Sequence, residues 1–95
     1  MSSPDVGQLF EFLFASFDAN SLHWQQLGTE ETFGTARKNF MIFVDSSFLW
    51  LVNSNGCELL RIRAEDDSRV AWIYQNARCA AQEQLEKVIH DFIVG

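Results

Sequence analysis

The residues best suited to chemistry lie near the C-terminus, between Cys79 and His90. If this stretch is a helix, one polar face carries Cys79, Glu83, Glu86 and His90. A thiol in a first helical turn is favoured as the thiolate, and Glu86 with His90 supplies half of a metal site. A metal site needs further ligands, and the only other histidine is His23. An ordinary solvated face is the alternative, so we retain Cys79 and His90 as candidates and predict no catalytic residue, metal site or cofactor.

No sequence motif specifies a reaction. The chain has no CxxC, HExxH or GxSxG motif, and its glycines at 28 and 34 are isolated from any Lys-Ser or Lys-Thr pair. An enzyme of unknown class is therefore the third of three functional hypotheses.

Aromatic side chains offer a second kind of site. The chain has nine Phe, three Trp and one Tyr. Trp24 and Trp72 are candidates for an apolar pocket or a partner surface, together with Phe12, which falls outside the apolar stripe of the first helix. A packed core is the alternative, because a small domain has little room to enclose a cavity.

Composition narrows the classes of partner. The 95 residues form one domain, 1–95, with a net charge of −6. Nucleic acid binding is disfavoured because it requires a basic field, whereas an acidic surface suits a basic protein. No run of about 20 apolar residues indicates a membrane span, and the N-terminus has no basic signal region. The sequence therefore predicts a cytoplasmic protein with reduced cysteines.

The periodicity predicts an α+β fold, with an N-terminal helix, an antiparallel β-meander of three to five strands and a C-terminal helix. Ser3 and Pro4 suit a helix start. Residues 40–44, 48–52 and 57–64 are predicted strands, with a tight turn at 53–56. Residues 22–27 give a weak strand signal, and residues 28–39 indicate a loop or irregular strand.

Residues 70–92 allow two assignments. The run 70–74 is β-branched and aromatic, which favours a fourth strand followed by a helix that Asn76 caps. The alternative is one long helix, because the apolar residues from Val70 to Phe92 keep helical phase. In both assignments the C-terminal helix runs to Ile93, and its expected buried side includes Ala77, Ala81, Leu85, Val88 and Phe92.

The two central strands are apolar on both faces, whereas a sheet with one wet face alternates apolar with polar residues. Two helices on opposite faces would cover such a sheet. The alternative is that both helices lie on one side and a second copy covers the other, with a two-fold dimer as the first expectation. The predicted interface residues are Phe40, Ile42, Phe48, Trp50 and Val52.

The runs FMIFVDSSFLWLV and RVAWIYQNA carry much of the apolar character, and neither is a family signature. In its length of under a hundred residues and its compact α+β organisation, the chain resembles the short α+β proteins that mobile integron gene cassettes encode. This resemblance is one of type and carries over no site residue. It implies a bacterial accessory protein, commonly oligomeric.

The leading functional hypothesis is a small acidic, homo-oligomeric protein-interaction module. A specific form is an inhibitor or immunity-type protein that masks a basic toxin or nuclease, as the charge of −6 suggests. The second hypothesis is a protein that binds a small apolar or aromatic ligand.

Overall fold

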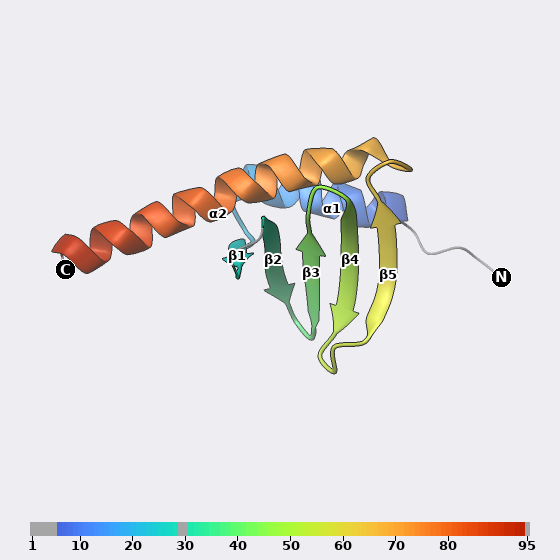
Figure 1. Ribbon diagram of the computed structural model, residues 1–95, viewed down its shortest axis with the longest axis horizontal. Coiled ribbons are helices and arrows are strands. Elements are labelled where there is room, and N and C mark those ends of the chain that lie inside the picture. The colour runs from blue at the N-terminus through green and yellow to red at the C-terminus, as the bar shows by residue number, and fades with distance from the viewer. Residues whose placement is uncertain (1–5, 29–30, 95) are drawn as a thin grey trace.

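A computed structural model, which describes residues 6–28 and 31–94, shows an α+β fold. The elements in chain order are α1 (Val6–Ala19), β1 (Gln25–Leu27), β2 (Thr32–Arg37), β3 (Phe40–Val44), β4 (Phe48–Asn53), β5 (Glu58–Arg63) and α2 (Ser68–Val94). The strands form one antiparallel sheet in the order β1-β2-β3-β4-β5 (Figure 1). The predicted fold class is confirmed. The predicted helix start at Ser3 and Pro4 lies outside the described residues.

Local hydrogen bonds explain why the central strands turn where the sequence predicts. The Asp45 carboxylate accepts hydrogen bonds from the backbone N–H of Ser47 at 2.7 Å and of Phe48 at 2.8 Å. After β4 the Asn53 side chain accepts from two backbone N–H groups, each at 3.0 Å. Gly56 completes this turn with a φ of 83°, which a residue without Cβ adopts at little cost. These bonds close the β3–β4 and β4–β5 hairpins.

The strand β2 lies in the stretch for which the sequence indicates a loop or irregular strand. It pairs with β3 in a continuous register from Phe33 opposite Val44 to Arg37 opposite Phe40. Gly34 interrupts its β-forming residues. The pairing with β3, across the two-residue turn at 38–39, therefore determines that β2 is a regular strand.

The core lies between one face of the sheet and the two helices. Phe33, Val44 and Leu49 are successive cross-strand neighbours, so their side chains share a face, and all three are buried. They belong to one cluster with residues of both helices, among them Phe10, Leu13, Val70, Ile73 and Ala77. Both helices therefore cover the same side of the sheet, and no described element covers the other.

The favoured assignment of residues 70–92 as a strand and a helix capped by Asn76 is wrong, because α2 is a single helix from Ser68. Asp67 is the N-cap: its carboxylate accepts from the Arg69 N–H at 3.0 Å, and its carbonyl accepts from the Val70 N–H at 3.1 Å. Asn76 instead donates to the carbonyl of Trp72, one turn back in the helix. Burial of a helical stripe against the sheet and α1 outweighs the β-propensity of residues 70–74.

The second half of α2 extends beyond the sheet (Figure 1). A helix of 27 residues is about 40 Å long, whereas the outer strands of a five-stranded sheet are only about 19 Å apart. The expectation that Leu85, Val88 and Phe92 are buried is therefore wrong, and all three are exposed. The sheet ends at β1 before the apolar stripe of the helix does.

Removal of the α2 cap gives a pH-dependent loss of stability. The guanidinium of Arg69, 2.7 Å from the Asp67 carboxylate, lowers the pKa of Asp67 below 3.8. A lowered carboxyl pKa stabilises the fold above the unfolded value, and this contribution is lost as the pH falls through the folded one. We expect Asp67→Ala to reduce the free energy of unfolding at pH 7 by about 0.5–2 kcal/mol in urea titrations. The difference from wild type should shrink below pH 3.8.

The matched control is Asp66→Ala, because this exposed neighbour makes only a long ion pair, with Arg63 at 4.0 Å, among the described residues. Its substitution should change the free energy of unfolding by less than about 0.5 kcal/mol. Equal losses in the two variants would contradict the capping role of Asp67.

Gly34 makes room for an aromatic ring on the side of the sheet away from the helices. A Cβ at this position would lie 2.8 Å from Cδ1 of Phe43 and 3.1 Å from Cδ1 of Leu27. We expect Gly34→Val to reduce the free energy of unfolding by about 1–3 kcal/mol through overpacking. Ala36→Val, two residues along the same strand at an exposed position, is the control and should have little effect. A Gly34→Val protein as stable as wild type would show that Phe43 does not need this space.

Candidate interaction surface

The projecting segment of α2, residues 82–94, carries a row of exposed apolar side chains. Leu85, Val88 and Phe92 are 54%, 53% and 88% exposed. At about 100° per residue, these three lie within roughly 40° of Ala81, the last buried residue of the helix. The exposed row is therefore the continuation of the stripe that packs on the sheet.

The opposite face of the projecting segment is mainly polar, although Ile93 and Val94 near the end of the helix are exposed apolar residues away from the row. A shallow hollow on it is lined by Glu83, Glu86, Lys87, His90 and Asp91. The segment is thus amphipathic, with one apolar and one charged side, although nothing described lies against the apolar side. A contiguous apolar row of this kind is typical of a surface that binds another protein.

The two chemical candidates lie on the polar side of α2. Cys79 is a free, exposed thiol. Because α2 begins at Ser68, Cys79 is well past the first turn, and the argument for a dipole-stabilised thiolate no longer holds. Across residues 6–28 and 31–94, no group of three or more His, Cys, Asp and Glu side chains is placed to hold a metal ion.

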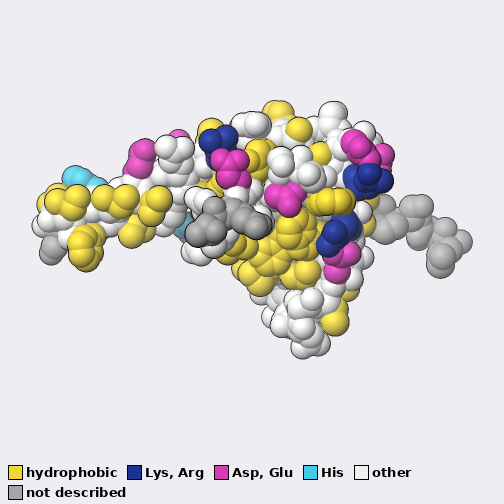
Figure 2. Space-filling model, viewed as in Figure 1, with side chains coloured by type: hydrophobic (Ala, Val, Ile, Leu, Met, Phe, Trp, Pro, Cys, Tyr) yellow, Lys and Arg dark blue, Asp and Glu magenta, His cyan; other side chains and the backbone are white. Residues whose placement is uncertain are grey.

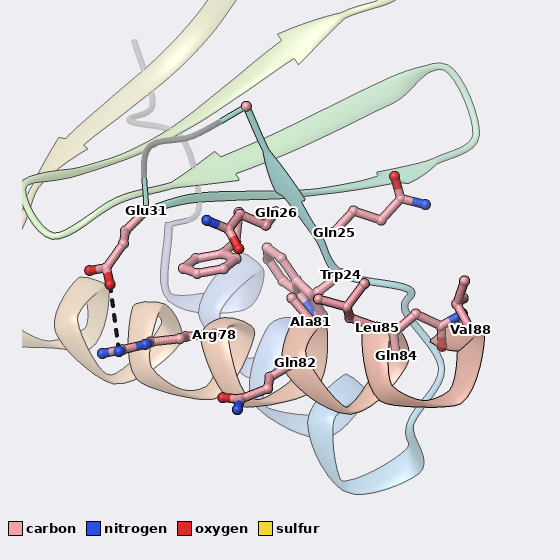
Figure 3. A pocket seen from close by; sticks show the side chains of 12 residues that line it. Trp24, Gln25, Gln26, Glu31, Arg78, Ala81, Gln82, Gln84, Leu85 and Val88 are labelled. Atoms are coloured by element: carbon pink, nitrogen blue, oxygen red, sulfur yellow. Dashed lines mark ion pairs between the residues drawn. The ribbon is translucent and has the colours of Figure 1, made fainter. Parts of the chain in front are cut away.

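A hollow of about 660 Å³, the edge hollow, lies where the helix leaves the sheet. Its apolar lining is Trp24, Phe33, Ala81, Leu85 and Val88, and glutamines from β1 and α2 supply much of the rest. Figure 3 shows Trp24, Ala81 and Leu85 in the middle of the gap between β1 and α2, with Val88 at the end away from Glu31. The exposed row on α2 therefore begins inside a concave site.

The closed end of the edge hollow is held by polar contacts. Glu31 lies 3.5 Å from Arg78, and it also accepts a hydrogen bond from the Tyr74 hydroxyl at 2.7 Å. This bond to the carboxylate is the main reason that the pKa of Tyr74 is raised. The contacts tie the start of β2 to α2, so this end of the hollow is pre-formed.

Trp24 is the rigid wall of the edge hollow. It is only 1% exposed and stacks on Phe17 of α1 at a centroid distance of 5.6 Å. Phe17 in turn meets Trp72 edge-on at 5.7 Å. The predicted pocket residues Trp24, Trp72 and Phe12 do not share one pocket, because Trp72 packs against α1 and Phe12 lines a different cavity.

That second cavity, the hairpin cavity, lies between α1 and the β2–β3 hairpin and has a volume of about 330 Å³. Phe12, Phe40, Ile42 and Leu51 are among its apolar lining residues. Thr35 also lines it and is 6% exposed. Its hydroxyl has no hydrogen-bond partner among the described residues, which is uncommon for a buried polar group.

The outer face of the sheet, which faces away from the helices, is a third apolar area. The ring of Phe43 lies 5.6 Å from that of its cross-strand partner Trp50. Arg61 lies over Phe48 at 5.0 Å and over Trp50 at 5.6 Å, and Glu58 holds it by an ion pair of 2.6 Å. Figure 2 shows hydrophobic side chains over the middle of the sheet and again along the projecting end of α2.

The five predicted interface residues do not form one surface. The β3–β4 register pairs Phe43 with Trp50, so Phe48, Trp50 and Val52 lie on the outer face. Phe40 and Ile42 lie on the helix side, where they line the hairpin cavity. The prediction combined two faces because the register of a hairpin cannot be read from either strand alone.

None of the helices in the described part of the chain is long and apolar enough to span a membrane. Comparison of the chain with protein-family models, with curated proteins and with solved structures found no match. The projecting segment and the edge hollow are therefore the features of the molecule that bear on its function.

Proposed function

We propose that this chain is a small acidic, homo-oligomeric protein-interaction module that associates through the projecting segment of α2. The observation that carries the proposal is the exposed row Leu85, Val88 and Phe92, which continues the phase of the buried stripe. Burying a side chain of this kind contributes about 1.5–3 kcal/mol, so leaving three exposed side by side forgoes much of the stability of a small domain. A partner on this row recovers that free energy.

The charged side of the segment supports a second contact. Glu83 and Glu86 remain in solvent when the apolar row is covered, because they lie on another side of the helix. An oligomer would then present an acidic surface, which suits the inhibitor or immunity-type role against a basic target. The cassette-type bacterial origin and the cytoplasmic location remain predictions from the sequence.

Sedimentation velocity over a range of concentrations tests the proposal. We expect the wild-type mass to exceed the 10.9 kDa of a single chain at high concentration and to fall on dilution. Phe92→Asp should shift this equilibrium toward single chains by at least about 100-fold, since it places a charge in a desolvated contact. His90→Asp introduces an aspartate on the opposite face of the same helix and should leave the equilibrium unchanged.

A wild-type mass of 10.9 kDa at every concentration would overturn self-association. Circular dichroism of both variants should match wild type, because both substituted side chains are exposed on the projecting segment. Equal weakening by the two substitutions would show that general charge repulsion, and no apolar contact, governs the mass.

A specific observation favours a second function, the binding of a small aromatic ligand in the hairpin cavity. The buried hydroxyl of Thr35 lies without a described partner in a lining that is apolar apart from Arg37 and Lys38. Such a cavity suits a compact aromatic molecule with one polar group, since the hydroxyl either donates to it or accepts from it.

Thermal unfolding with benzene, benzyl alcohol and acetophenone tests this second function. A ligand that binds only the folded state raises the melting temperature. We expect the two polar probes to raise it more than benzene, and Thr35→Val to abolish that difference while preserving the side-chain shape. No shift with any of the three probes at millimolar concentration would argue against the ligand site.

A further inference from the structure

The apolar positions of α2 around the projecting segment are spaced symmetrically. Ala81, Leu85, Val88 and Phe92 follow one another at intervals of four, three and four residues. This pattern reads the same in both directions about a midpoint between residues 86 and 87. Two antiparallel copies of the helix centred there bring Leu85 of each copy opposite the partner's Val88. They also bring Ala81 of each copy opposite the partner's Phe92, so the contact is self-complementary.

Size complementarity favours this antiparallel arrangement. Ala81 is the smallest side chain of the row and lies at the edge hollow, whereas Phe92 is the largest and is 88% exposed. Antiparallel pairing sets the largest side chain against the smallest, beside the aromatic walls of Trp24 and Phe33. Parallel pairing would set Phe92 against Phe92 and leave the hollow unfilled.

The distribution of charge is also compatible with a second copy, although each chain has a net charge of −6. The helix positions that flank the row near the hollow are Gln82 and Gln84, which are neutral and line the hollow. In the antiparallel arrangement the acidic side chain of Asp91 comes near Gln84 of the partner, which lies on the same flank of the row and whose amide is a hydrogen-bond donor. Glu83 and Glu86 lie away from the row, so no two acids oppose each other across it.

The available area fits a dimer. The apolar side chains of the projecting segment, Leu85, Val88, Ile89, Phe92 and Ile93, are each at least 49% exposed, so each chain offers roughly several hundred Å² of apolar surface. Two copies together supply the apolar part of a small but stable interface, which buries about 1,200–2,000 Å² with slightly more than half of it apolar. On the outer sheet face, by contrast, Arg61 already covers part of Phe48 and Trp50.

We infer that a second copy of this chain occupies the edge hollow, with the two α2 helices antiparallel about a two-fold axis. Each Phe92 is then seated in the partner's hollow, over the floor that the largely buried Trp24, Phe33 and Ala81 form. The inference rests on the proposed self-association and adds its geometry: the hollow is incomplete in one chain, and the partner contributes the residue that fills it.

Disulfide trapping tests the geometry in the full chain. The exposed thiols are first removed as Cys57→Ser and Cys79→Ser, and then Ala81→Cys and Phe92→Cys are introduced in separate proteins, one with a mass tag. Like positions would lie about 16 Å apart along the paired helices, beyond the roughly 7 Å that a disulfide spans between Cα atoms. We expect cross-linked dimer after oxidation of the mixture and none from either protein alone.

A second pair of cysteine positions covers the case in which replacing Phe92 itself prevents association. If Phe92→Cys is a single chain by sedimentation, a mixture of Leu85→Cys and Val88→Cys, which retains Phe92, should give the cross-linked heterodimer in excess over like-with-like products. Tryptophan fluorescence gives a test independent of both pairs. In a Trp50→Phe, Trp72→Phe background, which leaves Trp24 as the single tryptophan, Phe92→Ala should change the emission in the concentration range where the parent protein associates, whereas His90→Ala should not.

The outcomes separate this inference from the proposed function. Cross-linking that is favoured in the mixtures over like-with-like products supports both. A two-chain mass with like-with-like products equal to or above the mixed ones, or with no product from either pair, overturns the antiparallel geometry and leaves self-association standing. A single-chain mass for the wild type at all concentrations overturns both.

Discussion

The packing of α2 across the sheet is the interaction on which the rest of the structure depends. Its first half buries Val70, Ile73 and Ala77 against the strands and α1, and these contacts lie in the same cluster as Phe10 and Leu13. A small domain has few such side chains, so losing this contact would leave α1 as the only described element that covers the sheet. The one-sided arrangement of the helices follows from it.

The same packing creates the candidate site. A helix of 27 residues is longer than the five-stranded sheet that it crosses is wide. Its apolar stripe therefore continues beyond the surface that buries it. The edge hollow forms at the point of departure, between the three-residue strand β1 and α2. Core and binding surface are therefore two parts of one stripe, and the position of β1 separates them.

The residue at which α2 begins also determines whether Cys79 and His90 are placed to do chemistry. With the cap at Asp67, residue 79 lies in the helix interior, and the features that suggested a reactive thiol or a metal ligand become parts of a solvated polar face. The molecule then offers apolar rows and hollows for binding, and its charged residues chiefly pair with neighbours, as Arg61 does with Glu58 and Arg69 with Asp67.

The sequence by itself determined the features that depend on near neighbours. The turns at Asp45 and at Asn53 to Gly56, the two central strands and the helical phase from Val70 to Phe92 all arise from residues within a few positions of one another. The α+β class and the order of elements follow from these local signals.

Only the tertiary structure decided features that depend on pairing and packing between elements. Pairing with β3 made β2 a regular strand, and burial against the sheet made residues 70–74 helical against their β-propensity. The hairpin register divided the predicted interface between two faces. The width of the sheet left Leu85, Val88 and Phe92 exposed. The spacing of apolar residues along a helix indicates which side of the helix is buried. The length of that side which is buried depends on the element that packs against it.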